Sequence, residues 1–104
     1  MPTAIVAAND ELALGLMKAL AERGITVPED VSVTGFDDVP SSAYFPSALT
    51  TIRQDFAALG REVLGLAVTA IQTGETPESK VLPVHFVPRA STAAPRTHPL
   101  LSSK

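Results

Sequence analysis

Two short apolar runs, each ending abruptly at polar residues, constrain the fold of this chain more than any other feature. The first covers residues 4–8 and stops at Asn9, and the second covers residues 31–36 and stops at Asp37 and Asp38. A helix-like segment of the length of one crossover separates them. If the runs are parallel neighbouring strands, Asn9 and Asp37 emerge at one edge of a sheet, where open α/β sheets bind ligands. The sequence therefore predicts a small-molecule site at this edge.

The segment between the two runs has the periodicity of an amphipathic helix. Asn9 or Asp10 is suited to cap its N-terminus, and Gly24 is suited to end it. The spacing predicts a buried stripe that consists of Leu12, Leu16, Ala19 and Leu20. Strand, helix and strand then form a right-handed βαβ unit, in which Gly35 allows close approach of the backbone.

The second half of the chain is more varied. We expect a loop over residues 39–48, an extended segment over residues 49–53, a helix over residues 56–73 that ends at Gly74, and a strand over residues 81–87. The predicted buried face of this helix consists of Phe56, Leu59, Val63, Leu66 and Ala70. Pro83 indicates an edge position or a bulge in the last strand, and residues 91–104 have the composition of a frayed tail.

Composition limits the class of protein. The 104 residues make one domain at most, and 45% hydrophobic with 18% charged residues is typical of a globular chain. The net charge is −3 and the basic residues are scattered, so we expect no nucleic-acid binding by this segment alone. The absence of cysteine excludes disulfides and suits a cytoplasmic location. We see no signal peptide or membrane span, and the abrupt start at a strand leads us to expect that the N-terminal part of a larger protein is missing.

The polar residues at the predicted sheet edge are the candidate ligand contacts. A carboxylate there can accept paired hydrogen bonds from sugar hydroxyls or purine N–H groups, and alternation along a strand lets only one of Asp37 and Asp38 face a crevice. The alternative is a solvated turn or a loop cap. Asn9 offers both a donor and an acceptor, a role that is compatible with capping the helix.

Other side chains carry weaker signals. Phe56 is suited to stack on a ligand or to fill the core, and Tyr44 to cover the core edge or lie in an interface. We expect His85 to pack on a strand and His98 to have no role. No histidine pair has metal-ligand spacing, and neither a phosphate loop nor a Ser-His-Asp set is recognisable, so we predict no catalytic residue, no metal and no cofactor.

Several segments of the sequence, taken together and in order, resemble those of one protein family. They are PTAIVAAND at residues 2–10, ALGLMKALAERG at 13–24, VPEDVSVTGFDD at 27–38, LTTIRQD at 49–55, and the close at 82–88 with Ser91 and Thr92. Together they resemble the effector-binding half of a lactose-repressor (LacI/GalR) family transcriptional regulator. The resemblance covers nearly the whole chain apart from its tail.

The resemblance implies an incomplete α/β fold of the periplasmic-binding-protein-like type, in which two subdomains flank a cleft. Residues 1–90 would be a partial effector-binding domain: residues 1–48 the βαβ unit of the C-terminal subdomain, 49–54 a crossover, 55–74 a helix of the other subdomain and 81–90 the last strand. The tail covers residues 91–104. If the helix over residues 56–73 lacks the sheet on which it packs in the family, the isolated fragment should be loosely folded or oligomeric.

The resemblance also implies roles for particular residues. Asn9, Asp37 and Phe56 match family positions at the effector, and Tyr44 with the helix that carries Leu12 and Leu16 matches part of the family's dimer interface. The implied partners are a sugar- or nucleoside-class effector, a second copy of the chain, and operator DNA, bound only through an N-terminal helix-turn-helix domain that is missing here. No membrane partner is implied.

Four readings of function remain open from the sequence. The first is the effector-sensing part of a transcriptional regulator. The second is a fragment of a sugar-binding protein of an uptake system. The third is an enzyme in which Asp37 and Asp38 hold Mg²⁺, which the position of Lys80 before the last strand disfavours. The fourth is a structural remnant without activity.

Overall fold

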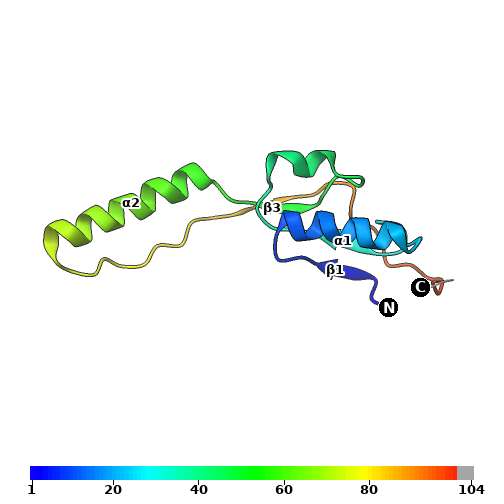
Figure 1. Cartoon of the computed structure of the whole chain (residues 1–104). Helices are drawn as coiled ribbons and strands as arrows, with labels where there is room; N and C mark the ends of the chain where they lie inside the picture. The colour runs from blue at the N-terminus through cyan, green and yellow to red at the C-terminus, as the bar shows by residue number, and fades with distance from the viewer. Residues whose placement is uncertain (101–104) are drawn as a thin grey trace. The chain divides into compact units, whose positions relative to one another are not determined.

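A computed structural model describes residues 1–100 of the chain (Figure 1). The chain divides into two compact units. Unit 1 consists of Met1–Arg53 together with the segment from Phe86 onward, and unit 2 consists of Gln54–His85. Unit 1 is therefore built from two separate stretches of sequence, and unit 2 is inserted between them.

Unit 1 begins with the predicted strand, helix and strand. These are β1 (Ala4–Val6), α1 (Asp10–Glu22) and β2 (Ser32–Thr34). The strands are parallel, and Ala4 pairs with Ser32. Regular strand is shorter than the apolar runs, although the Ala7 amide still donates to the Thr34 carbonyl at 2.8 Å. The predicted α/β class and parallel βαβ unit are confirmed.

Two further strands form a second sheet. After the 3₁₀ helix η1 (Pro40–Tyr44), which lies where we expected only loop, come β3 (Thr51–Arg53) and β4 (His85–Val87), which are neighbours in a second sheet. Isolated parallel bridges join Thr34 to Thr50 and Asp37 to Arg53, so β3 lies beside β2 and the residues that follow it. The strand predicted over residues 81–87 is thus confined to its last three residues, since Pro83 has no N–H for a ladder.

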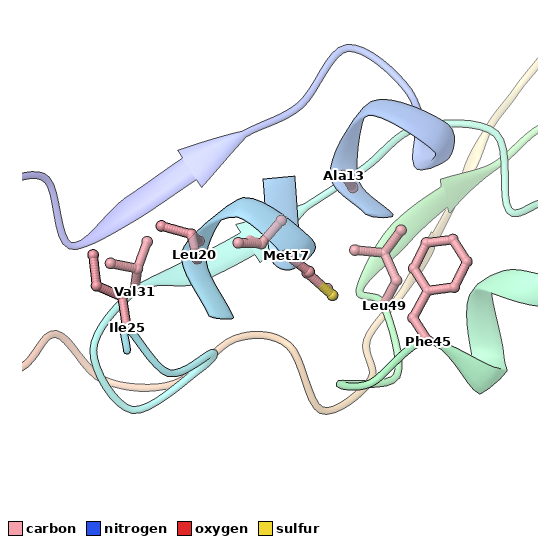
Figure 2. Close-up of a cluster of buried hydrophobic side chains, with 8 residues drawn as sticks. Ala13, Met17, Leu20, Ile25, Val31, Phe45 and Leu49 are labelled. Atoms are coloured by element: carbon pink, nitrogen blue, oxygen red, sulfur yellow. The ribbon is translucent and has the colours of Figure 1, made fainter. Parts of the chain in front are cut away.

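The core of unit 1 lies between α1 and the strands (Figure 2). It consists of Ala13, Met17, Leu20, Ile25, Val31, Val33, Phe45 and Leu49. The predicted stripe of α1 was only partly right. Leu20 is buried and Leu16 is partly buried, but Leu12 and Ala19 are exposed, and Ala13 and Met17 occupy the inner face in their place. Small Ala13 is fully buried, which allows the helix to pack closely on the strands.

Unit 2 contains α2 (Phe56–Thr73), with the limits predicted from the sequence. The Asp55 side chain caps its start by accepting a hydrogen bond from the Ala58 amide at 2.9 Å. Gly74 ends it in the left-handed conformation, with φ of 71°. The prediction of a buried face on α2 was wrong, because nothing within residues 1–100 buries any residue of this helix. Phe56, Leu59 and Val63 are exposed, while Leu66 and Ala70 are only partly covered.

The segment after β4 is bonded to unit 1 over its described length, in contrast to the frayed tail that the composition predicts. The Ser91 hydroxyl is fully buried, donates to the Val33 carbonyl at 2.5 Å and accepts from the Thr50 amide at 2.8 Å. Arg96 donates to the carbonyls of Met1 and Pro2, each at 2.9 Å. The last residues of the predicted tail, 101–104, lie outside the described residues.

Candidate functional site

The carboxyl ends of β1 and β2 form the candidate site. The register that pairs β1 with β2 continues at the same offset to Asn9 and Asp37, and the Asp10 amide donates to the Phe36 carbonyl at 3.1 Å. The two loops that carry Asn9 and Asp37 are therefore hydrogen-bonded to each other, as predicted for one sheet edge. The Asn9 Oδ1 atom accepts from the Leu12 amide at 2.8 Å, so Asn9 is the cap of α1.

Asp37 and Asp38 adopt backbone conformations that are rare for residues with side chains. Their φ angles are 125° and 57°. Positive φ is costly outside glycine, and it persists where the surrounding structure fixes it, often at functional sites. The Asp37 amide donates to the Ile52 carbonyl at 2.8 Å, which joins this turn to β3.

The Asp38 carboxylate is held by three side chains. Its Oδ1 accepts from the Ser42 hydroxyl at 3.0 Å and from Arg89 Nη2 at 2.8 Å, and its Oδ2 accepts from Arg53 Nε at 2.7 Å. Burial by itself would raise the pKa of Asp38, but the hydrogen bonds from Arg53, Arg89 and Ser42 outweigh it and lower this pKa below its usual range. The Asp38 carboxylate is therefore ionised more readily than usual and held in place by these three side chains.

Asp10 also supports this turn through hydrogen bonds. Its side chain is fully buried; Oδ2 accepts from the Val39 amide at 2.8 Å and Oδ1 from the Thr51 hydroxyl at 2.6 Å. Gly35 is the residue that permits this approach, because a Cβ there would overlap Asp10 Oδ1 and lie 2.8 Å from Leu49 Cδ2. The close approach predicted at Gly35 is confirmed.

A pocket of about 400 Å³ opens on unit 1 beside the strand ends. Its lining is mainly apolar and comes from β1, β2, β3 and the segments that continue them, with Phe86 from β4. Asn9 and Asp37 lie next to this lining in sequence but are not part of it. The pocket is of the size that small ligands occupy in proteins.

The remaining predicted site residues lie elsewhere. Phe56 belongs to unit 2 and is 54% exposed, so its proposed contact with an effector stays a prediction. Tyr44 is 87% exposed and Leu12 is 57% exposed, while Leu16 packs partly against the core. Their place in a dimer interface also stays a prediction.

Sequence reasoning missed several residues that shape the site. Asp10 was considered only as a helix cap, and Arg53 and Arg89 were not singled out, because no local pattern relates these two residues to Asp38. His98, for which we expected no role, lies 3.1 Å from Asp30 in an ion pair if the ring is protonated. Within residues 1–100, no three histidine, aspartate or glutamate side chains gather closely enough to hold a metal ion. No helix of that part of the chain is long and apolar enough to cross a membrane.

Comparison with known proteins gives a consistent result. Residues 1–92 match the family model described as a periplasmic binding protein-like domain, so the chain is part of a domain of that class. It is 41% identical over 97 residues to the lactose operon repressor of Escherichia coli K12, covering 93% of this chain and 27% of that protein. It is 42% identical over 71 residues to the transcriptional repressor PurR of Haemophilus influenzae Rd, covering 68% and 21%. The chain spans about a quarter of the length of these curated relatives.

Comparison with solved structures points to the same family as the sequence comparisons. The lac repressor dimer bound to operator and the anti-inducer ONPF superposes with a TM-score of 0.79 at 40% identity, over 89% of this chain and 32% of that one. A LacI family transcriptional regulator from Enterococcus faecium with bound ribose gives a TM-score of 0.76 at 43% identity, over 88% and 34%. The chain belongs to the LacI/GalR family of transcriptional regulators.

Proposed function

We propose that this chain is the effector-sensing and dimerisation part of a LacI-type transcriptional regulator. The effector is a sugar or a related small molecule, and operator DNA is bound by a separate N-terminal helix-turn-helix domain. The placement of Asn9 and Asp37 at one edge of the parallel strands, beside the apolar pocket, carries this proposal. The relatives are named as repressors and regulators, which supports a binding role and not an enzymatic one, and a role at operator DNA agrees with a cytoplasmic location.

Three residues are proposed as effector contacts. Asp37 supplies a carboxylate that accepts hydrogen bonds from hydroxyl groups, and Asn9 supplies an amide with donor and acceptor. Phe56 supplies an aromatic face from unit 2. In this assignment residues 1–48 belong to the C-terminal subdomain, residues 49–54 form the crossover and residues 55–74 belong to the other subdomain. Leu12, Leu16 and Tyr44 are the proposed dimer contacts. Leu12 and Tyr44 are exposed and Leu16 is partly buried, so all three are accessible to a second copy.

A chimera tests this function directly. The segment of the E. coli lactose operon repressor that aligns with this chain is replaced by the chain itself, and binding of ONPF is measured by calorimetry. We expect the chimera to bind ONPF, and we expect Asp37→Asn to weaken binding by about 1–3 kcal/mol, or roughly 5- to 150-fold. Glu29→Gln, which removes an exposed carboxylate elsewhere on unit 1, is the matched control.

Two results would contradict the proposal. A chimera that is a folded, operator-binding dimer but does not bind ONPF would show that this segment does not supply a working half of the effector site. Equal affinity of the Asp37→Asn and parent chimeras would remove Asp37 from that site.

A further inference from the structure

Both connections between the two units pass beside the same carboxylate. The chain leaves unit 1 after Arg53, at the end of β3, and re-enters it at Phe86, shortly before Arg89. Arg53 Nε donates to Asp38 Oδ2 at 2.7 Å, and Arg89 Nη2 donates to Asp38 Oδ1 at 2.8 Å. One side chain is therefore bonded to the outgoing connection (β3) and to the returning connection (residues 86–89).

The two ion pairs differ in how firmly they are held. The side chains of Asp38 and Arg89 are 9% and 18% exposed, whereas that of Arg53 is 56% exposed. Arg89 Nη1 also donates to the Ser42 hydroxyl at 2.9 Å and to the Leu49 carbonyl at 3.0 Å. Because the Arg89 guanidinium is fixed by several acceptors, its pair with Asp38 has a defined geometry, while the exposed pair with Arg53 is weaker and easier to break.

The Asp37–Asp38 turn links this carboxylate to the proposed effector contact. Both residues have positive φ, and Ser42, Asp10 and β3 hold the turn in that conformation through side-chain and backbone hydrogen bonds. A rotation of the peptide between Asp37 and Asp38 therefore displaces the Asp38 carboxylate, because one residue joins it to Asp37.

We infer that Asp38 is a positioning residue that transmits the state of the turn at Asp37 to both connections between the units. The Asp38 oxygens are bonded within unit 1, to Ser42, Arg53 and Arg89. The regulatory meaning of this coupling rests on the proposed function, in which Asp37 binds the effector. The coupling itself is a property of unit 1 and is testable without any ligand.

Nuclear magnetic resonance of the arginine side chains in the full 104-residue chain provides the test. Asp37→Asn serves as the perturbation, and the Arg53 Nε–H and Arg89 Nη–H signals serve as the readout. We expect Asp37→Asn to shift both signals, and we expect both shifts to be lost when the same change is made in an Asp38→Asn background. Glu29→Gln is the control perturbation and should shift neither signal.

A second variant separates positioning from general loss of structure. Arg89→Lys keeps the charge but removes the planar guanidinium that joins Asp38, Ser42 and Leu49. In this variant Arg53 should still respond to Asp37→Asn, while the amides of residues 86–89 should lose the response that they show in the parent. Asp38→Glu, which restores the charge, should recover part of the response that Asp38→Asn abolishes.

The inference is overturned if the arginine signals respond equally in the parent and Asp38→Asn backgrounds. The hydrogen bond from the Asp37 amide to the Ile52 carbonyl would then carry the change along β3. It is also overturned if Asp37→Asn shifts neither arginine in the parent chain. Neither result depends on whether Asp37 binds a sugar, so the calorimetric test above and this one can fail separately.

Discussion

Replacing Gly35 with alanine should destabilise unit 1 strongly, because the added methyl has no space. It would overlap Asp10 Oδ1, lie 2.8 Å from Leu49 Cδ2 and lie 3.2 Å from Asp10 Cα. Asp10 and Leu49 are fully buried, and the Asp10 carboxylate is bonded to Val39 and Thr51. Relief of the overlap therefore requires movement of the first turn of α1 or loss of a buried hydrogen bond.

The expected loss of folding free energy follows from these two ways of relieving the overlap. Overpacking of a filled interior costs about 1–3 kcal/mol. Loss of a hydrogen bond to a charged group costs about 1.5–3 kcal/mol. We expect Gly35→Ala to lower the free energy of unfolding by about 3 kcal/mol, which is a large share of the roughly 5–15 kcal/mol typical of domains. For a unit of this size the corresponding fall in Tm is about 12–24 °C.

Urea unfolding and thermal melting of the two alanine variants measure this effect. Gly15→Ala is the matched control: it lies inside α1 of the same unit, and its added Cβ would meet no atom within 4 Å. Since alanine is the better helix former, this control should stabilise the chain by up to about 1 kcal/mol. Opposite signs for the two substitutions are the expected result. A Gly35→Ala chain within about 0.5 kcal/mol of the parent, the usual range of neutral surface changes, would refute the packing described around Asp10.

Three further predictions concern unit 1 and α2. Ser91→Ala removes the hydroxyl that satisfies the Val33 carbonyl and the Thr50 amide, and should cost about 1–3 kcal/mol in urea unfolding, while Thr97→Ala, in the exposed part of the same segment, should cost nothing measurable. Gly74→Ala should destabilise α2 by about 1 kcal/mol, because the φ angle of Gly74 is 71° and alanine is strained in this left-handed conformation. Thermal melting followed by circular dichroism measures this change, and a neutral effect would contradict the left-handed cap. The pKa of Asp38 is lower in the folded chain than in the unfolded chain. The ionised Asp38 carboxylate therefore contributes its full stabilisation above the ordinary aspartate pKa, near pH 4, and this stabilisation is lost as the pH falls through the lower pKa of the folded state. Unfolding measured between pH 2 and 6 should therefore show a smaller acid loss in Asp38→Asn than in the parent, and equal losses would contradict this assignment.

Local signals account for what the sequence predicted correctly. Asn9 and Asp55 are residues with short polar side chains directly before an apolar periodic segment, and Gly74 directly follows one, so the limits of α1 and α2 could be read from a few residues. The parallel pairing of β1 and β2 could be predicted because the two apolar runs lie one crossover apart. The helix limits depend on neighbours in sequence, and the strand pairing depends only on the length of one crossover.

The errors concern features that depend on distant residues. In α1 the spacing of Leu12 and Leu16 fits a helical face as well as that of Ala13 and Met17 does, and only the strands beneath select the second face. Asp38 and Arg89 are 51 positions apart, so no local pattern announces their ion pair. The Ser, Thr, Ala and Pro composition after residue 90 is typical of a disordered tail, but one buried hydroxyl at Ser91 ties this segment to β2 and β3.

The division of unit 1 into two stretches of sequence has a consequence during translation. The Val33 amide donates to the Ser91 carbonyl at 2.9 Å, and the residues are 58 positions apart. At ribosomal rates of roughly 5–20 residues per second, β2 must wait about 3–12 s for this partner, while all of unit 2 is synthesised. Throughout that interval the Val33 amide on this edge of β2 lacks its partner, although Gly35 can already pair with Thr50. Unpaired backbone groups on a strand edge can associate with other chains. The order of synthesis therefore makes Ser91, and not any residue of α1, the residue that completes this edge of β2.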